Sequence, residues 1–367
     1  MTNDLLYQIA LTLVPNIGDV HAKALVARYG DAESVFKAKK RDLENQEGIG
    51  TVRANSIKAF TNFESSEVEA KFIDQYKITP LFITDKNYPQ RLLNCYDSPL
   101  LLYYRGNADL NSSRIISIVG TRIHSDYGKM ACEKFVEELQ GENILIVSGL
   151  AFGIDTIAHK TALKNNLATV GVLAHGLDRI YPAQNKTMAK QMVEQGGLLT
   201  EFISNTIPDK QNFPKRNRIV AGMCDAVVVI ETGKKGGSLI TAELGNSYNK
   251  DVFAIPGRTI DVKSEGCNYL IKNNKASLLT CAADMLEMMN WKDMKKAHPK
   301  KQRELFIELT DDEKIVTGIL QNQPTIQIDQ LYFKSGLSSS AMASALLMLE
   351  MQGIVTSLPG KVYMMSP

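Results

Sequence analysis

Cations gather at the start of a helix that we expect in the middle of the chain. The segment 212–218 reads NFPKRNR, and Pro214 occupies the place of a first helical residue. Helix N-termini favour Asp and Glu because the macrodipole is positive there. This turn instead carries three cations, Lys215, Arg216 and Arg218. Because such a cluster costs free energy unless an anion occupies it, and because Phe213 could stack a base beside it, the segment predicts a nucleic-acid contact.

Three further turns combine glycine with a strand on one side and a helix on the other. They read VGTR (119–122), SGLAFGID (148–155) and GKKGGSLITAE (233–243). Backbone N–H groups can approach a phosphate in such turns, and Arg122 would add a bidentate contact. Each turn alone is equally typical of tight packing of a helix on a sheet. Neither GxGxxG nor GxxxxGK[ST] is present, so the turns disfavour dinucleotide binding and exclude a P-loop hydrolase.

A catalytic interpretation rests on three side chains. Asp155 and His159 are four residues apart on one helix, and Glu243 belongs to another helix. A carboxylate at a helix start also stabilises the helix dipole, and a single His on an apolar helix is commonly a packed core residue. No Ser-His-Asp, thiol-His or metal-ligand grouping is evident in the sequence. We therefore predict no catalytic residue, no metal site and no cofactor.

Composition bounds the class of protein. The 367 residues, 44% hydrophobic and 22% charged, leave room for two or three domains. The net charge of +2 is so small that a polyanion site must come from local clusters. Five widely spaced cysteines without a CxxC pair indicate a reducing compartment. Without a basic leader or an apolar run of membrane-spanning length, we expect a cytoplasmic protein that does not contact a membrane.

Short apolar runs alternate with helical stretches between residues 115 and 280, which predicts βα units and a parallel sheet. Two earlier runs, 81–84 and 100–104, are expected to extend the edge of this sheet. The expected central strands are 115–119, 144–148, 168–173, 198–202, 226–231, 252–256 and 277–280.

The two ends of the chain follow helical patterns. In the first 76 residues, VPNIG (14–18) and EGIG (47–50) look like helix-hairpin-helix turns, although turns of this kind also serve packing alone. At the other end, three helices at 311–320, 328–334 and 338–352 and a hairpin about Pro359 predict a winged helix. The last helix lacks Lys and Arg, which favours a structural or protein-contact role. The expected divisions are a helical domain at 1–76, a Rossmann-like domain at 77–290, a basic linker at 291–307 and a winged-helix domain at 308–367.

Five motifs, in order, carry a resemblance to a known family. They are IVGTR, VSGLA-x-GID, GLD-x-x-YP, NFPKRNRIVAG and GSLITAELG, and they resemble the DprA/Smf family of DNA-processing proteins over about residues 80–274. The resemblance implies an α/β fold with an extended Rossmann-like core. It further implies a non-enzymatic, sequence-independent single-stranded DNA binder that protects incoming DNA and loads the RecA recombinase in natural transformation. A homodimer through the Rossmann-like domain is also implied.

The DNA pocket of that family indicates which residues are candidates here. Two lysines, Lys234 and Lys235, depart from the usual glycine loop and are expected to add DNA affinity. The candidate DNA-binding residues are Gly120, Thr121, Arg122, Ser148, Gly149, Phe213, Lys215, Arg216, Asn217, Arg218, Lys235, Gly236, Gly237 and Ser238.

Two other functions remain open at this point. The glycine loop and the downstream Glu243 are similar in layout to nucleotide phosphoribohydrolases of the lysine-decarboxylase-like group, which would make the protein an enzyme. Alternatively, the chain could be a protein-interaction scaffold with a vestigial nucleotide pocket. Loss of nucleic-acid affinity in Arg122→Ala would argue against the scaffold.

Overall fold

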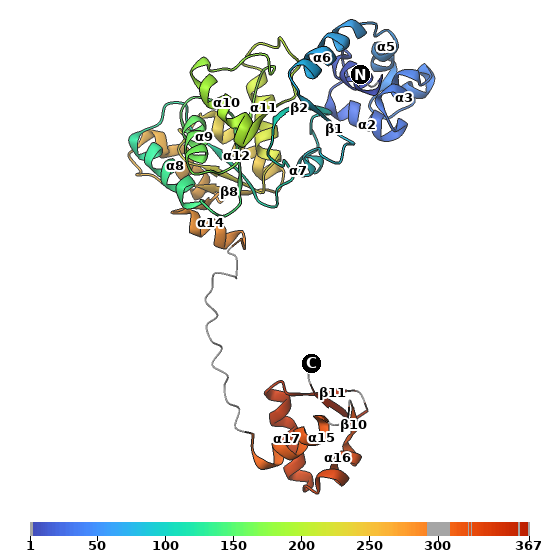
Figure 1. The fold of residues 1–367 in the computed structure, drawn as a ribbon, viewed down its shortest axis with the longest axis vertical. Coiled ribbons are helices and arrows are strands. Elements are labelled where there is room, and N and C mark those ends of the chain that lie inside the picture. The colour runs from blue at the N-terminus through green and yellow to red at the C-terminus, as the bar shows by residue number, and fades with distance from the viewer. Residues whose placement is uncertain (1–2, 292–308, 322, 324, 359, 366–367) are drawn as a thin grey trace. The chain divides into compact units, whose positions relative to one another are not determined.

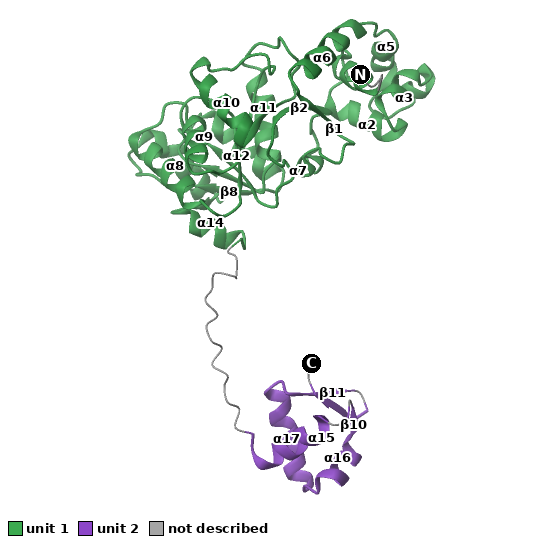
Figure 2. Cartoon of the chain, viewed as in Figure 1, with its two compact units in different colours: residues 1–292 green, residues 293–367 purple. Residues whose placement is uncertain are grey.

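The computed structural model describes residues 3–291, 309–321, 323, 325–358 and 360–365. The chain forms two compact units, residues 1–292 and 293–367 (Figure 2). Among the described helices, none combines the length and the hydropathy that crossing a membrane requires. The linker expected at 291–307 falls outside the described residues except for Trp291. That residue donates its backbone N–H to Leu286 at 2.7 Å and packs against the core, so the first unit includes it.

The first unit is built on a nine-stranded mixed sheet in the order β1-β2-β6-β5-β4-β3-β7-β8-β9. Figure 1 labels β1, β2 and β8 of this sheet. Strands β3 to β9 run parallel, whereas β2 lies antiparallel to β6 and β1 antiparallel to β2. The predicted α/β class and the predicted edge strands are therefore confirmed. The strands are β1 Thr79–Phe82, β2 Leu101–Gly106, β3 Ile115–Val119, β4 Leu145–Ser148, β5 Thr169–Val172, β6 Gly196–Thr200, β7 Ala226–Val229, β8 Asp251–Ala254 and β9 Ser277–Leu278.

One predicted strand is shifted. The apolar run at 198–202 predicted its span, but β6 begins at Gly196 and ends at Thr200. A Cβ on Gly196 would collide with the backbone of Thr169, and one on Gly197 would lie 2.7 Å from the Tyr104 hydroxyl. Glycine allows this close approach of neighbouring backbones, which a search for apolar residues does not detect. Glu201 consequently follows the strand rather than lying within it.

The apolar residues of the parallel strands alternate between two cores. On β3, Ile115 and Val119 face one core, and Ile116 and Ile118 face the other. Strands buried on both faces explain the continuous apolar runs in the sequence. Helices α11, α12 and α13 cover the first face, and α8, α9 and α14 cover the second. The elements are α7 Gln90–Leu93, α8 Asp126–Glu138, α9 Ile154–Lys164, η1 Ala183–Asn185, α10 Lys186–Gln195, α11 Asn212–Gly222, α12 Gly237–Ser247, η2 Val262–Ser264, α13 Glu265–Lys272 and α14 Ala282–Met288.

The N-terminal helices share a hydrophobic core with the edge of the sheet. Phe82 of β1 and Leu101 and Tyr103 of β2 pack in the same cluster as residues of α1, α2 and α6. The expected boundary between 76 and 77 therefore separates elements that bury one another. The helices are α1 Asn3–Leu13, α2 Asp19–Tyr29, α3 Ala32–Lys37, α4 Lys40–Glu44, α5 Gly50–Lys58 and α6 Phe63–Gln75.

The described residues of the second unit form three helices and a three-stranded sheet, the arrangement of a winged helix. Gly336 ends its second helix in the left-handed conformation, with φ of 67°. The Ser338 side chain accepts a hydrogen bond from the N–H of Ala341 at 3.3 Å and caps the third helix. The elements are α15 Asp311–Gln321, β10 Ile326–Gln327, α16 Ile328–Ser335, α17 Ser339–Met351, β11 Val355–Leu358 and β12 Val362–Met365.

Candidate functional site

The strand order of the sheet changes direction at one place. From β3 the chain adds β4, β5 and β6 on one side, and β7, β8 and β9 then extend the other side. In open α/β sheets, ligands bind outside the carboxyl ends of the strands at such a switch point. A cavity of about 540 Å³, hereafter the cleft, lies there, because its walls include the residues that follow β3, β4 and β7.

Most of the predicted DNA-binding residues meet in the cleft. Their segments are far apart in sequence, and the carboxyl ends of adjacent parallel strands bring them to one edge of the sheet. The predicted residues that line the cleft are Gly120, Thr121, Arg122, Gly149, Phe213, Arg216, Asn217, Gly236, Gly237 and Ser238.

The charge of the cleft is positive. Its lining contains three cations, Arg122, Lys210 and Arg216, and one carboxylate, Asp155. Arg122 and Lys210 are exposed, whereas Asp155 is buried and accepts a hydrogen bond from the N–H of Ala151 at 3.3 Å. Burial raises the pKa of Asp155, and Arg216 is the strongest opposing influence. The cleft is therefore suited to an anion.

Arg216 is a buried cation with a fixed position. Its guanidinium donates to the carbonyl oxygens of Gly149 and of Val172, the latter at 2.6 Å. Burial lowers the pKa of Arg216 to about 10, so the group remains charged at neutral pH. A Cβ on Gly149 would lie 2.5 Å from the guanidinium carbon, so this glycine is required for the side chain to pass. Arg216 thus contributes positive charge to the floor of the cleft without freedom to move.

An aromatic surface adjoins the cations. The guanidinium of Arg122 lies 4.8 Å from the centroid of the Phe213 ring, and that of Arg216 lies 6.0 Å from it on the buried side. The Tyr181 ring is 6.3 Å from the Phe213 ring, and its side chain is 47% exposed. Exposed rings next to cations provide surfaces on which bases can stack while the phosphate is neutralised.

Two helices begin at the cleft. Phe213 and Pro214 belong to the first turn of α11, and Gly237 and Ser238 to the first turn of α12. Neither first turn contains an acidic residue. The first N–H groups of a helix have no partner within it and attract anions. Ser238 is 6% exposed, and its hydroxyl has no hydrogen-bond partner among the described residues, so a ligand in the cleft could satisfy it.

Four predicted residues lie outside the cleft. Ser148 is fully buried and donates its hydroxyl to the carbonyl of Ile118 at 2.6 Å, which is a role within the sheet. Lys235 is exposed on the loop before α12. Lys215 and Arg218 line a different hollow, between α11 and the N-terminal helices.

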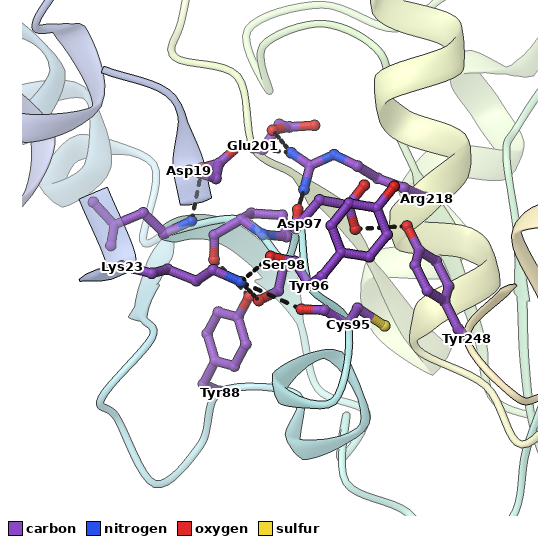
Figure 3. Close-up of polar contacts among 12 residues, drawn as sticks. Asp19, Lys23, Tyr88, Cys95, Tyr96, Asp97, Ser98, Glu201, Arg218 and Tyr248 are labelled. Atoms are coloured by element: carbon purple, nitrogen blue, oxygen red, sulfur yellow. Dashed lines mark hydrogen bonds and ion pairs between the residues drawn. The ribbon is translucent and has the colours of Figure 1, made fainter. Parts of the chain in front are cut away.

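Arg218 is held by protein carboxylates (Figure 3). Its guanidinium donates to Glu201, to Asp19 at 3.0 Å and to the carbonyl of Asp97. Tyr248 donates to the carboxylate of Asp97 at 2.6 Å. Burial raises the pKa of Glu201 to about 7, although Arg218 beside it opposes this rise. The anions that balance Arg218 come from the chain itself, which favours a structural role for this residue over the predicted contact with DNA.

The residues of the catalytic interpretation are not grouped. His159 is fully buried, and its ring lies 2.7 Å from the Thr169 hydroxyl, away from the cleft lining. Burial lowers the pKa of His159 to about 3, with Arg216 adding to the effect. The Glu243 side chain is 57% exposed and pairs with Lys275 at 3.4 Å instead of facing the cleft. In the described part of the chain, no group of three His, Cys, Asp or Glu side chains could hold a metal ion.

Lys210 lines the cleft but is not among the residues predicted from the sequence. It lies in the loop before α11, where neither strand nor helix periodicity applies. Its one signal is its position three residues before Phe213. Ile123 and Ile240 were also missed, and both are exposed apolar side chains beside the cleft.

Comparisons with known proteins place the chain in a family. The model described as DNA recombination-mediator protein A matches residues 79–290, and the DprA winged helix domain matches residues 299–361. Protein Smf of Synechocystis sp. is 30% identical over 97% of this chain and 98% of its own length. The X-ray structure of DNA processing protein A from Streptococcus pneumoniae matches with a TM-score of 0.65 at 33% identity, covering 77% of this chain and 97% of that one.

A second solved structure concerns the single-stranded DNA binding mode of DNA processing protein A from Helicobacter pylori. It matches with a TM-score of 0.53 at 29% identity, covering 58% of this chain and 96% of that one.

Proposed function

The chain belongs to the family of DNA recombination-mediator protein A, and from that premise we propose that its cleft binds single-stranded DNA without reading the base sequence. The relative from Helicobacter pylori, which binds single-stranded DNA, supports this proposal. Within the protein itself, the main support is the composition of the cleft: three cations, one buried carboxylate and two helix N-termini at the switch point of the sheet.

Each part of the cleft has a distinct role in this proposal. Arg122 and Lys210 are exposed and neutralise phosphates as the strand arrives. The hydroxyl of Ser238 and the first N–H groups of α12 then donate to phosphate oxygens. Phe213 stacks on a base, and since every base has a π-face, stacking does not select a sequence. The buried Arg216 maintains a positive potential beneath the bound strand.

The same geometry supports binding without catalysis. Asp155 is buried and accepts a hydrogen bond from Ala151, His159 is buried in the interior, and the exposed Glu243 pairs with Lys275. The phosphoribohydrolase alternative needs Glu243 beside the bound sugar, and the scaffold alternative does not account for a positive cleft. We therefore propose that the cleft holds the strand and leaves its covalent bonds unchanged.

The family resemblance also motivates a wider role. We propose that the protein protects incoming DNA in the cytoplasm and loads the RecA recombinase onto it during natural transformation, acting as a homodimer through the Rossmann-like domain. This role predicts that the protein accelerates RecA filament formation on a single strand already coated by single-strand-binding protein. Equal rates of filament formation with and without the protein would exclude RecA loading while leaving DNA binding in place.

Fluorescence anisotropy of a labelled oligothymidine across a salt series tests the binding proposal. The wild type should bind, with log K falling by roughly 0.7 per unit of log salt for each phosphate neutralised. The double variant Arg122→Ala/Lys210→Ala should bind at least about tenfold more weakly, with a slope shallower by about 1.4. The control Lys160→Ala/Lys164→Ala removes two exposed lysines of α9 that lie outside the cleft. Absence of wild-type binding at low salt would overturn the proposal.

A further inference from the structure

Residues of the loop just before Tyr181 line a further hollow, distinct from the cleft and from the hollow beside Arg218. This α10 groove, a cavity of about 600 Å³, is walled by Arg105 of β2, by residues 177–180 and by one face of α10. Its floor is apolar, with Ile180 and Val193 among its residues. Its rim carries four cations and two carboxylates, namely Arg105, Arg179, Lys186, Lys190, Asp178 and Glu194.

The two carboxylates of the α10 groove neutralise only part of the charge on its four cations. Asp178 accepts hydrogen bonds from Arg179 at 2.8 Å and from the N–H of Asn205 at 2.9 Å, so it balances one cation only. Within the described residues, Arg105, Lys186 and Lys190 form no ion pair with any carboxylate. In the part of the chain that the structure describes, three cations around the groove therefore lack an ion pair, and Glu194 is the one further carboxylate on its rim.

The charges of α10 run against its dipole. Lys186 is the first residue of the helix, Lys190 follows one turn later on the same face, and Glu194 lies in the last turn. Helices are stabilised by the opposite order, and like charges four residues apart repel each other. A polyanion in the α10 groove would relieve both effects. Since both lysines are exposed, their ammonium groups are free to reach it.

One loop carries residues of both the α10 groove and the aromatic surface of the cleft. Tyr181 lies beside Phe213, and the residue before it, Ile180, lines the α10 groove. The loop between them is held in place, because the Tyr181 N–H donates to Nε2 of His175 at 3.2 Å. Burial lowers the pKa of His175, which keeps the ring neutral and able to accept this bond. A strand stacked on Phe213 and Tyr181 would next reach Arg179 and the lysines of α10.

We propose that the α10 groove binds the phosphates of the same DNA strand where it leaves the cleft past Tyr181. This inference rests on the proposed function and extends it, since it assigns a second backbone-binding subsite and a direction for the strand. The neighbouring rings of Tyr181 and Phe213 favour a nucleic acid over an acidic peptide, which would need the cations but not the rings.

The test compares oligothymidines of two lengths, about 5 and about 20 nucleotides, within the range of site sizes known for single-strand binders. The variant is Lys186→Ala/Lys190→Ala, and the control is Lys160→Ala/Lys164→Ala, a pair with the same spacing and charge on α9. The full-length chain is used throughout, and its thermal unfolding is checked for each variant. We expect the variant to bind the long oligonucleotide on the order of tenfold more weakly, with a salt slope shallower by about 1.4, and the short one as the wild type does.

Three outcomes would overturn the inference. Long-oligonucleotide affinity equal to that of the control would show that the lysines of α10 make no contact. An equal loss of affinity for the long and the short oligonucleotide would mean that the two lysines act within the cleft and not at a subsite beyond it. If the variant loses the affinity of the wild type for polyglutamate and keeps its affinity for DNA, the occupant of the α10 groove is an acidic peptide. If the wild type binds neither oligonucleotide, the proposed function itself fails, which distinguishes that failure from the other three.

Discussion

Arg216 and Arg218 are two residues apart on α11 and face different parts of the molecule. At 3.6 residues per turn their side chains point about 200° apart around the helix. Arg216 lies against Gly149 at the floor of the cleft, whereas Arg218 lies between the carboxylates of Glu201, just after β6, and of Asp19 in α2. Both are buried, at 4% and 9% exposure. On one face of α11 the anions are carboxylates of the chain itself, Glu201 and Asp19. On the other face Asp155 is the one carboxylate among three cations that line the cleft, and we propose that a ligand supplies the remaining negative charge.

The largest effect is expected from Arg218. Arg218→Ala leaves Glu201, whose side chain is only 11% exposed, without its cation, and breaking a largely buried ion pair in this way costs about 3 kcal/mol of stability. Urea unfolding of the first unit should show this loss. DNA affinity measured where the variant is still folded should stay near that of the wild type. The matched variant Arg218→Lys, which keeps a charge, should lose less stability. Normal stability with lost DNA affinity would place Arg218 in the DNA site and erase the contrast between the two faces.

On the cleft face, Phe213 is expected to act on affinity alone. Removing a stacking ring weakens single-strand binding by about 1–3 kcal/mol. Phe213→Ala should therefore raise Kd in anisotropy titrations without changing the salt slope, since no charge is lost. Phe333→Ala, which removes a ring 92% exposed in the second unit, is the control and should bind normally. A changed salt slope in Phe213→Ala would mean that the ring acts by positioning Arg122.

The interior beneath the cleft predicts a pH dependence. His159 has a pKa near 3 in the folded state and an ordinary value near 6.5 when unfolded, so between these values the unfolded chain binds more protons. The stability from this group is present above about pH 6.5 and falls as the pH is lowered, by about 2 kcal/mol between pH 7 and 5. In urea unfolding at several pH values, His159→Gln should be less sensitive to acid than the wild type. If the free energy of unfolding falls equally with pH in the wild type and in His159→Gln, His159 is not the source of the acid sensitivity.

The smallest effects come from two buried serines, which form a matched pair. Ser238→Ala removes a hydroxyl without a partner, so stability should stay level or rise by about 1 kcal/mol while DNA affinity falls severalfold. Ser148→Ala removes a hydroxyl bonded to Ile118, so stability should fall by about 1 kcal/mol and affinity should not change. Thermal unfolding measures the predicted change in stability of each variant, and anisotropy measures the predicted change in DNA affinity. If stability and DNA affinity change in the same way in both variants, the hydroxyl of Ser238 does not bind the DNA.

The sequence predicted the strands of the sheet well because residues buried on both faces leave continuous apolar runs, as in 115–119 and 226–229. It also located the turns that line the cleft, since glycine and cations at strand ends are visible locally. The environment of Arg218 was not visible, because its partners Glu201 and Asp19 lie 17 and 199 residues away. Lys210 was missed because a loop residue has no periodicity by which to recognise it.

The central claim is that the DNA strand lies on the cleft face of α11, and photocrosslinking tests it most directly. The full-length protein is bound to an oligothymidine containing 4-thiothymidine, irradiated and digested, and the crosslinked residues are identified by mass spectrometry. The account predicts crosslinks at Phe213 and Tyr181, which are lost in Arg122→Ala/Lys210→Ala at moderate salt. Crosslinks confined to residues 309–365, or to the N-terminal helices beside Arg218, would contradict it.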